Sequence, residues 1–250
     1  MLALHNVNKT YGNGTVALQG LNLDIGEHQF VSLLGPSGCG KSTALKLIAG
    51  LASASSGELR WADGVADPAA NIAFVFQEPT LMPWATVFDN VWLPLRLKGR
   101  SKADCHANVM AQLDAVGLGA FAHSYPRELS GGMKMRASIA RALITRPKLL
   151  LMDEPFAALD EMTRFKLNQD LLSAWQLHQF TTIFVTHSVY ESVFLSQRIV
   201  VMASRPGRVI AEIAVDAPYP RTEAFRTTAP YNAWCVEVSQ ALAHAGEHHG

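Results

Sequence analysis

Hydrophobic positions near the N-terminus roughly alternate with polar ones. The alternating apolar residues are Leu2, Leu4, Val7, Val16, Leu18, Leu21, Leu23 and Ile25. Turn-forming residues at 11–14 and 25–27 divide this stretch into two segments. Alternation of this kind predicts half-buried strands in a small antiparallel lobe, and Glu58–Trp61 is expected to add one more strand.

Farther along the chain the apolar residues form continuous runs instead. They are Phe30–Leu34, Ile72–Phe76, Leu149–Met152, Ile183–Val185 and Ile199–Met202. Such runs are typical of parallel strands that helices cover on both faces, so an α/β fold is predicted.

Helical spacing dominates between these runs and near the C-terminus. We expect one domain with its core at 1–83 and 144–215, a helical insertion at about 84–143 and a short tail at 216–250. The insertion shows apolar spacing at Val109, Leu113 and Val116. In the tail, a breaker cluster at 217–220 precedes a predicted amphipathic helix at 232–245.

The composition of the chain argues against some classes of function. The 250 residues are 49% hydrophobic and 17% charged, and 21 Lys and Arg balance 21 Asp and Glu. This neutral balance argues against a nucleic-acid-binding protein. No apolar run approaches the ~20 residues that span a bilayer, and we expect no signal peptide. The three cysteines are few and widely spaced, which suits a reducing compartment.

The segment Gly35–Thr43 matches G-x-x-x-x-G-K-[ST] and lies between a predicted strand and a predicted helix at 44–49. This context predicts a phosphate-binding loop, because glycines allow successive backbone N–H groups to face one anion. Lys41 is expected to reach the β- and γ-phosphates, and Ser42 to ligate Mg²⁺. Cys39, at the helix N-terminus, is expected to be a reactive thiol. The loop residues are Gly35, Pro36, Ser37, Gly38, Cys39, Gly40, Lys41, Ser42 and Thr43.

Two further segments carry candidate chemistry. The apolar run Leu149–Met152 ends in Asp153, a candidate for holding the Mg²⁺ water shell, and Glu154, a candidate general base. Ser130 is a sound N-cap for a helix that opens with Gly131 and Gly132. On its own, that segment indicates no more than a helix start.

Taken together, these motifs resemble the ATPase subunit of ATP-binding cassette (ABC) transporters over about residues 2–210. Leu129–Met133 resembles the signature motif, Asp153–Pro155 the Walker B end and Ala157–Asp160 the D-loop. Gln77 resembles the Q-loop glutamine, and His187 resembles the switch histidine.

The resemblance implies a P-loop NTPase (RecA-like) core with an antiparallel β lobe and an inserted helical subdomain. It implies hydrolysis of ATP with Mg²⁺ by Glu154, His187, Lys41 and Gln77. Tyr11 and Val16 would join the loop in holding ATP, with Tyr11 stacked on adenine. Ser130, Gly131 and Gly132 would cover the nucleotide from an opposite subunit. The implied Mg²⁺ ligands are Ser42, Gln77 and Asp153.

The same resemblance implies partners and a location. A head-to-tail homodimer would bind membrane permease subunits, indirectly serve a solute-binding protein, and lie peripherally on the cytoplasmic face of a bacterial cell membrane. Trp84, Phe88 and Trp92 are candidates to line the permease groove, although each could equally belong to a core. Gln77–Trp84 and Met133 resemble importers of nitrate, sulfonates and taurine.

Met133 departs from the resemblance, because many cassettes have glutamine there and methionine cannot donate the same hydrogen bonds. Three alternatives remain at this stage. A cassette ATPase that acts on nucleic acid or the ribosome would usually carry tandem cassettes or basic extensions. A nucleotide kinase would have no use for Leu129–Met133. A binding module without catalysis would not need Glu154 and His187.

Overall fold

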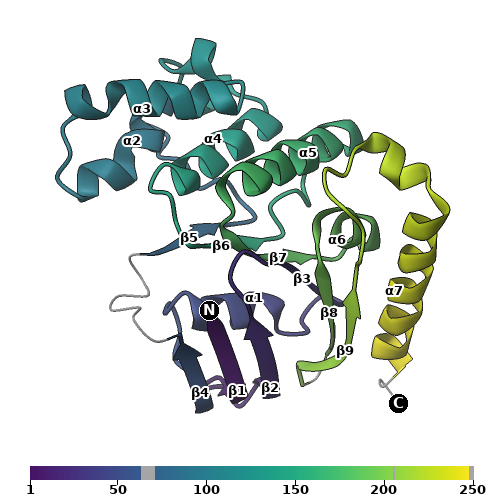
Figure 1. Ribbon diagram of the computed structural model, residues 1–250. Helices are drawn as coiled ribbons and strands as arrows, with labels where there is room; N and C mark the ends of the chain where they lie inside the picture. Colours follow the sequence, from purple (N-terminus) through teal and green to yellow (C-terminus); the bar gives the residue numbers. More distant parts are fainter. Residues whose placement is uncertain (63–70, 205, 248–250) are drawn as a thin grey trace.

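The strands of the chain form two sheets in the computed structural model, which describes residues 1–62, 71–204 and 206–247 (Figure 1). The smaller sheet has the order β2-β1-β4, and the larger one has the order β5-β6-β7-β3-β8-β9. The strands are β1 (Leu2–Thr10), β2 (Val16–Ile25), β3 (Phe30–Leu34), β4 (Ser56–Trp61), β5 (Ile72–Val75), β6 (Leu149–Asp153), β7 (Thr181–Thr186), β8 (Arg198–Ala203) and β9 (Arg208–Ala214). Parts of the predicted core and tail, at 63–70 and 248–250, lie outside the described residues.

The small sheet is antiparallel, as the alternating pattern predicts. Strand β1 pairs with β2 on one side, where Leu2 is opposite Ile25, and with β4 on the other, where Leu2 is opposite Trp61. Leu2, Leu4 and Val7 are buried, and the polar residues between them lie at the surface or close to it.

The large sheet contains all five continuous apolar runs. Strand β3 lies between the parallel strands β7 and β8, and β6 lies between β5 and β7. Strand β9 adds an antiparallel edge next to β8. The apolar runs do not predict β9, because most of its residues are partly or fully exposed and polar residues interrupt it.

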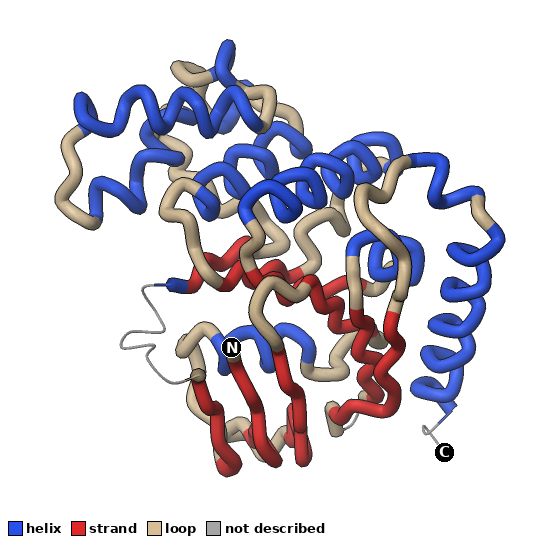
Figure 2. Tube along the Cα trace, viewed as in Figure 1, coloured by secondary structure: helices blue, strands red, loops and turns tan. Residues whose placement is uncertain are grey.

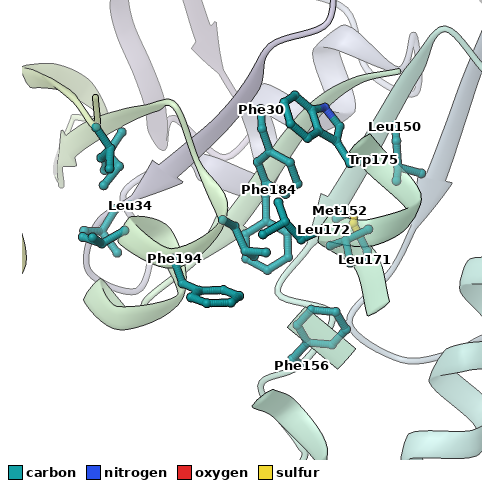
Figure 3. Packing of buried hydrophobic residues seen from close by; sticks show 14 of the residues in the cluster. Phe30, Leu34, Leu150, Met152, Phe156, Leu171, Leu172, Trp175, Phe184 and Phe194 are labelled. Carbon is teal, nitrogen blue, oxygen red and sulfur yellow. The ribbon is translucent and has the colours of Figure 1, made fainter. Parts of the chain in front are cut away.

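Both faces of the large sheet are covered. In β3, Phe30 and Leu34 join one apolar cluster, whereas Val31 and Leu33 join another on the opposite face. Helix α1 (Lys41–Ile48) lies between the two sheets, and Figure 2 shows other helices covering the opposite face. They are α4 (Gly131–Leu143), α5 (Glu161–His178), α6 (Val189–Leu195) and α7 (Ala229–Glu247). Figure 3 shows Phe30 and Phe184 packed with Trp175 of α5 on this side.

Helices α2 (Val87–Leu97) and α3 (Lys102–Ala115) form a separate apolar cluster with one face of α4. Val109 and Leu113 lie inside it, as their spacing predicts. Phe88 is also in this core and only 2% exposed, so the structure supports the core and not the permease groove as its place. The opposite face of α4 packs against the main core through Met135 and Ile139. Helix α4 therefore connects the insertion to the sheet.

The tail returns to the main core. A 3-10 helix, η4 (Glu223–Thr227), precedes α7. Val238 of α7 is fully buried, and Trp234, Ala241 and Leu242 pack beside it, which confirms the predicted amphipathic face. Arg221 is buried before η4, and its guanidinium donates to the carbonyl oxygens of Val193, Phe194, Ser196, Val215 and Ala217.

Candidate nucleotide site

The candidate residues gather beyond the carboxyl ends of parallel strands in the large sheet. The loop at 35–43 follows β3, Asp153 ends β6 with Glu154 directly after it, and His187 follows β7. Gln77 lies two residues beyond β5. The carboxyl edge of an open α/β sheet is where such folds bind ligands.

Glycines give the loop its shape. Gly38 and Gly40 have φ of 78° and 90°, in the left-handed region that glycine tolerates best. A Cβ on Gly40 would lie 2.6 Å from Leu18 Cδ2 and 2.7 Å from Ala17 O. Gly40 has no side chain that could cap α1, so the backbone N–H groups at this helix start can face an anion.

The Lys41 side chain folds back over the loop. It is only 4% exposed, and Nζ donates to Gly35 O at 2.7 Å and Pro36 O at 3.0 Å. Nζ also lies 3.9 Å from Glu154 Oε1. A cation held between the phosphate loop and the candidate base is well placed to bind a polyphosphate.

The Cys39 side chain is fully buried on the inner side of the loop. Burial raises the pKa of its thiol, and the neighbouring Lys41 only partly opposes that effect. A buried thiol with a raised pKa is a poor nucleophile, so the predicted reactivity of Cys39 is wrong. Only its backbone can contribute to an anion site.

Ser42 and Asp153 meet at the start of α1. The Ser42 hydroxyl donates to Asp153 Oδ1 at 2.8 Å. Burial raises the pKa of the Asp153 carboxyl, and the Ser42 hydrogen bond opposes this shift. A half-buried carboxylate beside a hydroxyl is a pair of hard oxygen ligands and fits the chemistry of Mg²⁺.

Glu154 adopts a strained backbone conformation. Its φ is 46°, and its N–H donates to Val185 O at 3.0 Å. A non-glycine residue in this region costs about 1–3 kcal/mol and is often found at functional sites. Its Oε2 lies 3.3 Å from His187 Nδ1, so Glu154, His187 and Lys41 form one cluster. The sequence predicts all three residues as site residues, but it does not predict the contacts between them.

Tyr11 and Val16 flank the loop at the surface. Tyr11 is 40% exposed and Val16 47% exposed. The Tyr11 hydroxyl lies 3.3 Å from Thr43 Oγ1, and Lys9 Nζ lies 5.2 Å from the ring centroid. An exposed aromatic ring beside the phosphate loop provides a stacking surface for a base.

The Gln77 side chain is exposed, and no hydrogen bond links it to Ser42 or Asp153 within the described residues. The segment after it is fixed by an arginine that sequence reasoning missed. Arg141 of α4 donates to Pro79 O and Thr80 O, both at 2.9 Å, and to Thr80 Oγ1 at 3.0 Å. An arginine in the last turn of an amphipathic helix gives no sequence signal for such a contact.

Ser130, Gly131 and Gly132 form the start of α4, and the two glycines lie against Leu159 and Thr163 at the start of α5. The Ser130 hydroxyl accepts from Met133 N at 3.3 Å, which confirms its role as N-cap. A Cβ on Gly132 would lie 2.6 Å from Thr163 Cγ2, and one on Gly131 would lie 3.5 Å from Leu159 Cδ2. The Met133 side chain packs against the helical cluster. The Ser130 helix start is therefore a second helix N-terminus, distinct from that of α1.

Two of the candidate aromatic residues differ in exposure. Trp84 is 76% exposed, whereas Trp92 is partly buried against the core of the helical cluster. Among the described helices, none combines the length and the apolar composition that crossing a membrane requires.

Comparison with known proteins identifies the family. A family profile described as ABC transporter matches residues 18–157. The chain is 46% identical over 205 residues to the nitrate import ATP-binding protein NrtD of Synechocystis, with 81% of this chain and 77% of NrtD covered. It is 43% identical over 227 residues to the aliphatic sulfonates import ATP-binding protein SsuB of Bacillus cereus, with 89% of each covered.

A solved structure agrees with the sequence comparison. The chain resembles a dimeric, post-hydrolysis structure of the ATP-binding cassette MJ0796 bound to ADP and Pi. The TM-score is 0.76 at 34% identity, covering 87% of this chain and 100% of the cassette. The chain belongs to the ABC transporter family and is an ATP-binding, ATP-hydrolysing subunit.

Proposed function

We propose that this ATPase powers import of a small anion of the nitrate, sulfonate or taurine type through a partner permease. The observation that carries the proposal is the similarity, at 43% and 46% identity, to proteins named for sulfonate and nitrate import. The neutral composition and the family assignment do not favour the alternative of a nucleic-acid or ribosome ATPase.

The phosphate chain of ATP would bind the backbone of the 35–43 loop. Lys41 would exchange its two carbonyl partners for phosphate oxygens, and Tyr11 with Val16 would contact the base. Glu154 would orient and deprotonate the attacking water, since its carboxylate lies beside Lys41 and His187. Lys41 and His187 would stabilise negative charge on the transferred group, and Gln77 would respond to the γ-phosphate.

Ser42, Asp153 and Gln77 would hold Mg²⁺. The first two already form a hydroxyl–carboxylate pair, and Gln77 would join them by a movement of its loop. The cation supplies charge neutralisation at the phosphate oxygens.

Ser130, Gly131 and Gly132 would serve the nucleotide of a second copy. Ser130 and Gly131 are exposed, whereas Gly132 is buried against Thr163. A head-to-tail homodimer would bring each helix start onto the partner's ATP. This arrangement would create two equivalent active sites.

The helical insertion, about 84–143, would bind the permease, with Trp84 as an exposed contact. The core would comprise 1–83 and 144–215, and 216–250 would form a tail. The complex would lie on the cytoplasmic face of a bacterial membrane and receive solute from a binding protein.

Reconstitution tests this function. The chain would be purified with its co-expressed permease, placed in liposomes, and supplied with labelled nitrate, taurine or an alkanesulfonate with the binding protein. We expect ATP-dependent uptake of one of these anions and none with Glu154→Gln. ATP hydrolysis without uptake of any of the three would contradict the substrate class.

A further inference from the structure

We infer that Arg164 and Glu191 form a bridge between the 157–160 segment and His187. Through this bridge, a shift of the 157–160 segment would change the position of the His187 side chain. The inference rests on the proposed role of His187 in hydrolysis. Arg164 lies in the first turn of α5 and Glu191 in the first turn of α6, so the bridge joins two helices that follow two different strands.

Arg164 holds the segment before its own helix. Its Nη2 donates to Leu159 O at 2.9 Å, and Leu159 precedes Asp160, which caps α5 by accepting from Thr163 N at 3.0 Å. Leu159 and Thr163 are also the residues that Gly131 and Gly132 approach. The Arg164 side chain is therefore bonded to the part of the chain that lies next to the Ser130 helix start.

Glu191 holds the residues on both sides of His187. Its Oε2 accepts from the Thr186 hydroxyl at 2.5 Å, and Thr186 Oγ1 accepts from Ser188 N at 3.0 Å. Ser188 Oγ in turn accepts from Glu191 N at 3.3 Å. This closed set of hydrogen bonds fixes the backbone from which the His187 side chain extends toward Glu154.

The side chains of Arg164 and Glu191 approach each other, but the distance between them is longer than a hydrogen bond. Arg164 Nε lies 3.7 Å from Glu191 Oε1, and neither atom makes a hydrogen bond within the described part of the chain. Shortening this distance by about 0.7 Å would bring it into the normal range for N–H···O. A cavity of 130 Å³ lies beside the pair and is lined by both residues together with Asn168, Phe165 and Arg226. There is room for a small movement of the α5 start toward α6.

In this proposal the bridge has two arrangements: the open one of this structure, with Arg164 Nε 3.7 Å from Glu191 Oε1, and a closed one with a shorter contact. Pressure of a second copy on the 157–160 segment would move Arg164 and close its bond to Glu191. Glu191 would then adjust Thr186 and Ser188, and with them the 3.3 Å contact of His187 with Glu154. Arg164 and Glu191 are positioning residues, because neither reaches the nucleotide cluster itself.

The test measures kcat and KM for MgATP in Arg164→Met, Glu191→Gln and the double variant. We expect kcat to fall about tenfold in each single variant, a typical size for loss of a coupling contact, with KM unchanged. The double variant should be no slower than the slower single variant, because both changes break one bridge. Arg164→Lys, which keeps the charge, should recover part of kcat.

Two reference variants distinguish a failure of the proposed bridge from a failure of the proposed role of His187. Arg226→Met removes another arginine from the same cavity but leaves the Leu159 and Glu191 contacts, so kcat should equal that of the parent. His187→Ala reports on the proposed function alone. If His187→Ala slows hydrolysis but Arg164→Met behaves like Arg226→Met, the bridge is refuted. Independent, multiplying effects in the double variant refute it as well. If His187→Ala has no effect, the proposed role of His187 fails first.

Discussion

The Ser42 hydroxyl lies 2.8 Å from Asp153 Oδ1, although 111 residues separate the two in sequence. The contact joins the first turn of α1 to the end of β6, a strand separated from β3 by β7. It arises because the parallel strands of one sheet end at the same edge. Two motifs that are separate in the sequence become one site of oxygen ligands.

Asp153→Asn is expected to weaken the dependence of ATPase activity on Mg²⁺ more than it weakens the binding of ATP itself. The amide keeps the shape of the side chain but removes its negative charge. Because charge stabilisation by a bound metal amounts to several kcal/mol, MgATP hydrolysis should fall at least about tenfold. Titration of ATPase activity with Mg²⁺ checks the first effect, and fluorescent-nucleotide binding in EDTA checks the second. Asp216→Asn, at an exposed carboxyl, is the control. An unchanged Mg²⁺ midpoint in Asp153→Asn would exclude this carboxyl as a ligand.

Gly35→Ala is expected to distort the phosphate loop. A Cβ at this position would lie 2.5 Å from Met202 O and 2.7 Å from Cys39 Sγ, and the first of these is backbone that cannot rotate away. Overpacking of this kind costs about 1–3 kcal/mol, and it should also lower ATP affinity. Calorimetry of ATP binding and thermal unfolding measure both effects. Gly12→Ala should be neutral, since a Cβ there meets nothing within 4 Å. Parent-like ATP affinity in Gly35→Ala would show that the loop tolerates the shift.

The sequence predicted the sheet and the chemistry of the site because both depend on local patterns. Continuous apolar runs identified β3, β6 and β7, and the loop motif named Lys41 and Ser42. The contacts that set the geometry are not local. The strained φ of Glu154 depends on its bond to Val185, and Arg141 reaches Thr80 across 61 residues. Phe88 illustrates a related limit, since an aromatic residue on an amphipathic helix is compatible with a core and with a docking surface.

Arg141→Met is expected to loosen the segment that follows Gln77. Three hydrogen bonds from Arg141 hold Pro79 and Thr80, and Thr80 has a strained φ of 48° that needs such support. Hydrogen exchange at residues 77–82 should quicken by at least about tenfold, since even one lost bond to a charged group costs about 1.5–3 kcal/mol. Arg136→Met, on the same helix but paired with Asp170, should leave these amides unchanged. Equal protection of 77–82 in both variants would contradict the assignment.

Arg221→Met is expected to destabilise the tail. The buried guanidinium donates to five carbonyl oxygens, three of them at the end of α6, and the loss leaves several buried acceptors without a donor. We expect a loss of about 3 kcal/mol in the free energy of unfolding, measured by urea denaturation. Arg60→Met, at a side chain that is 63% exposed, should leave the urea denaturation midpoint close to that of the parent. A similar small change in Arg221→Met would mean that water replaces the lost bonds.

Glu191 should make stability depend on pH. Burial raises the pKa of its carboxyl above the ordinary 4.5, against the opposing influence of Thr186, Arg164, Asn168 and His187. The folded state then binds the proton more tightly than the unfolded state. The stabilisation from this group is fully present below the unfolded pKa and is lost as pH rises through the folded pKa.

Glutamine at position 191 cannot titrate in this range, so the comparison of the parent with Glu191→Gln isolates the effect. Relative to the variant, the parent should lose unfolding free energy as the pH rises from the ordinary carboxyl pKa of 4.5 through the raised pKa of Glu191, because the buried carboxyl must then ionise. Urea denaturation over a series of rising pH values measures the difference. Glu161→Gln, at a carboxyl that is 85% exposed, should show no such change. A parent that instead gains stability over Glu191→Gln as pH rises would show that Arg164 outweighs burial and that the bridge is already closed in the isolated chain.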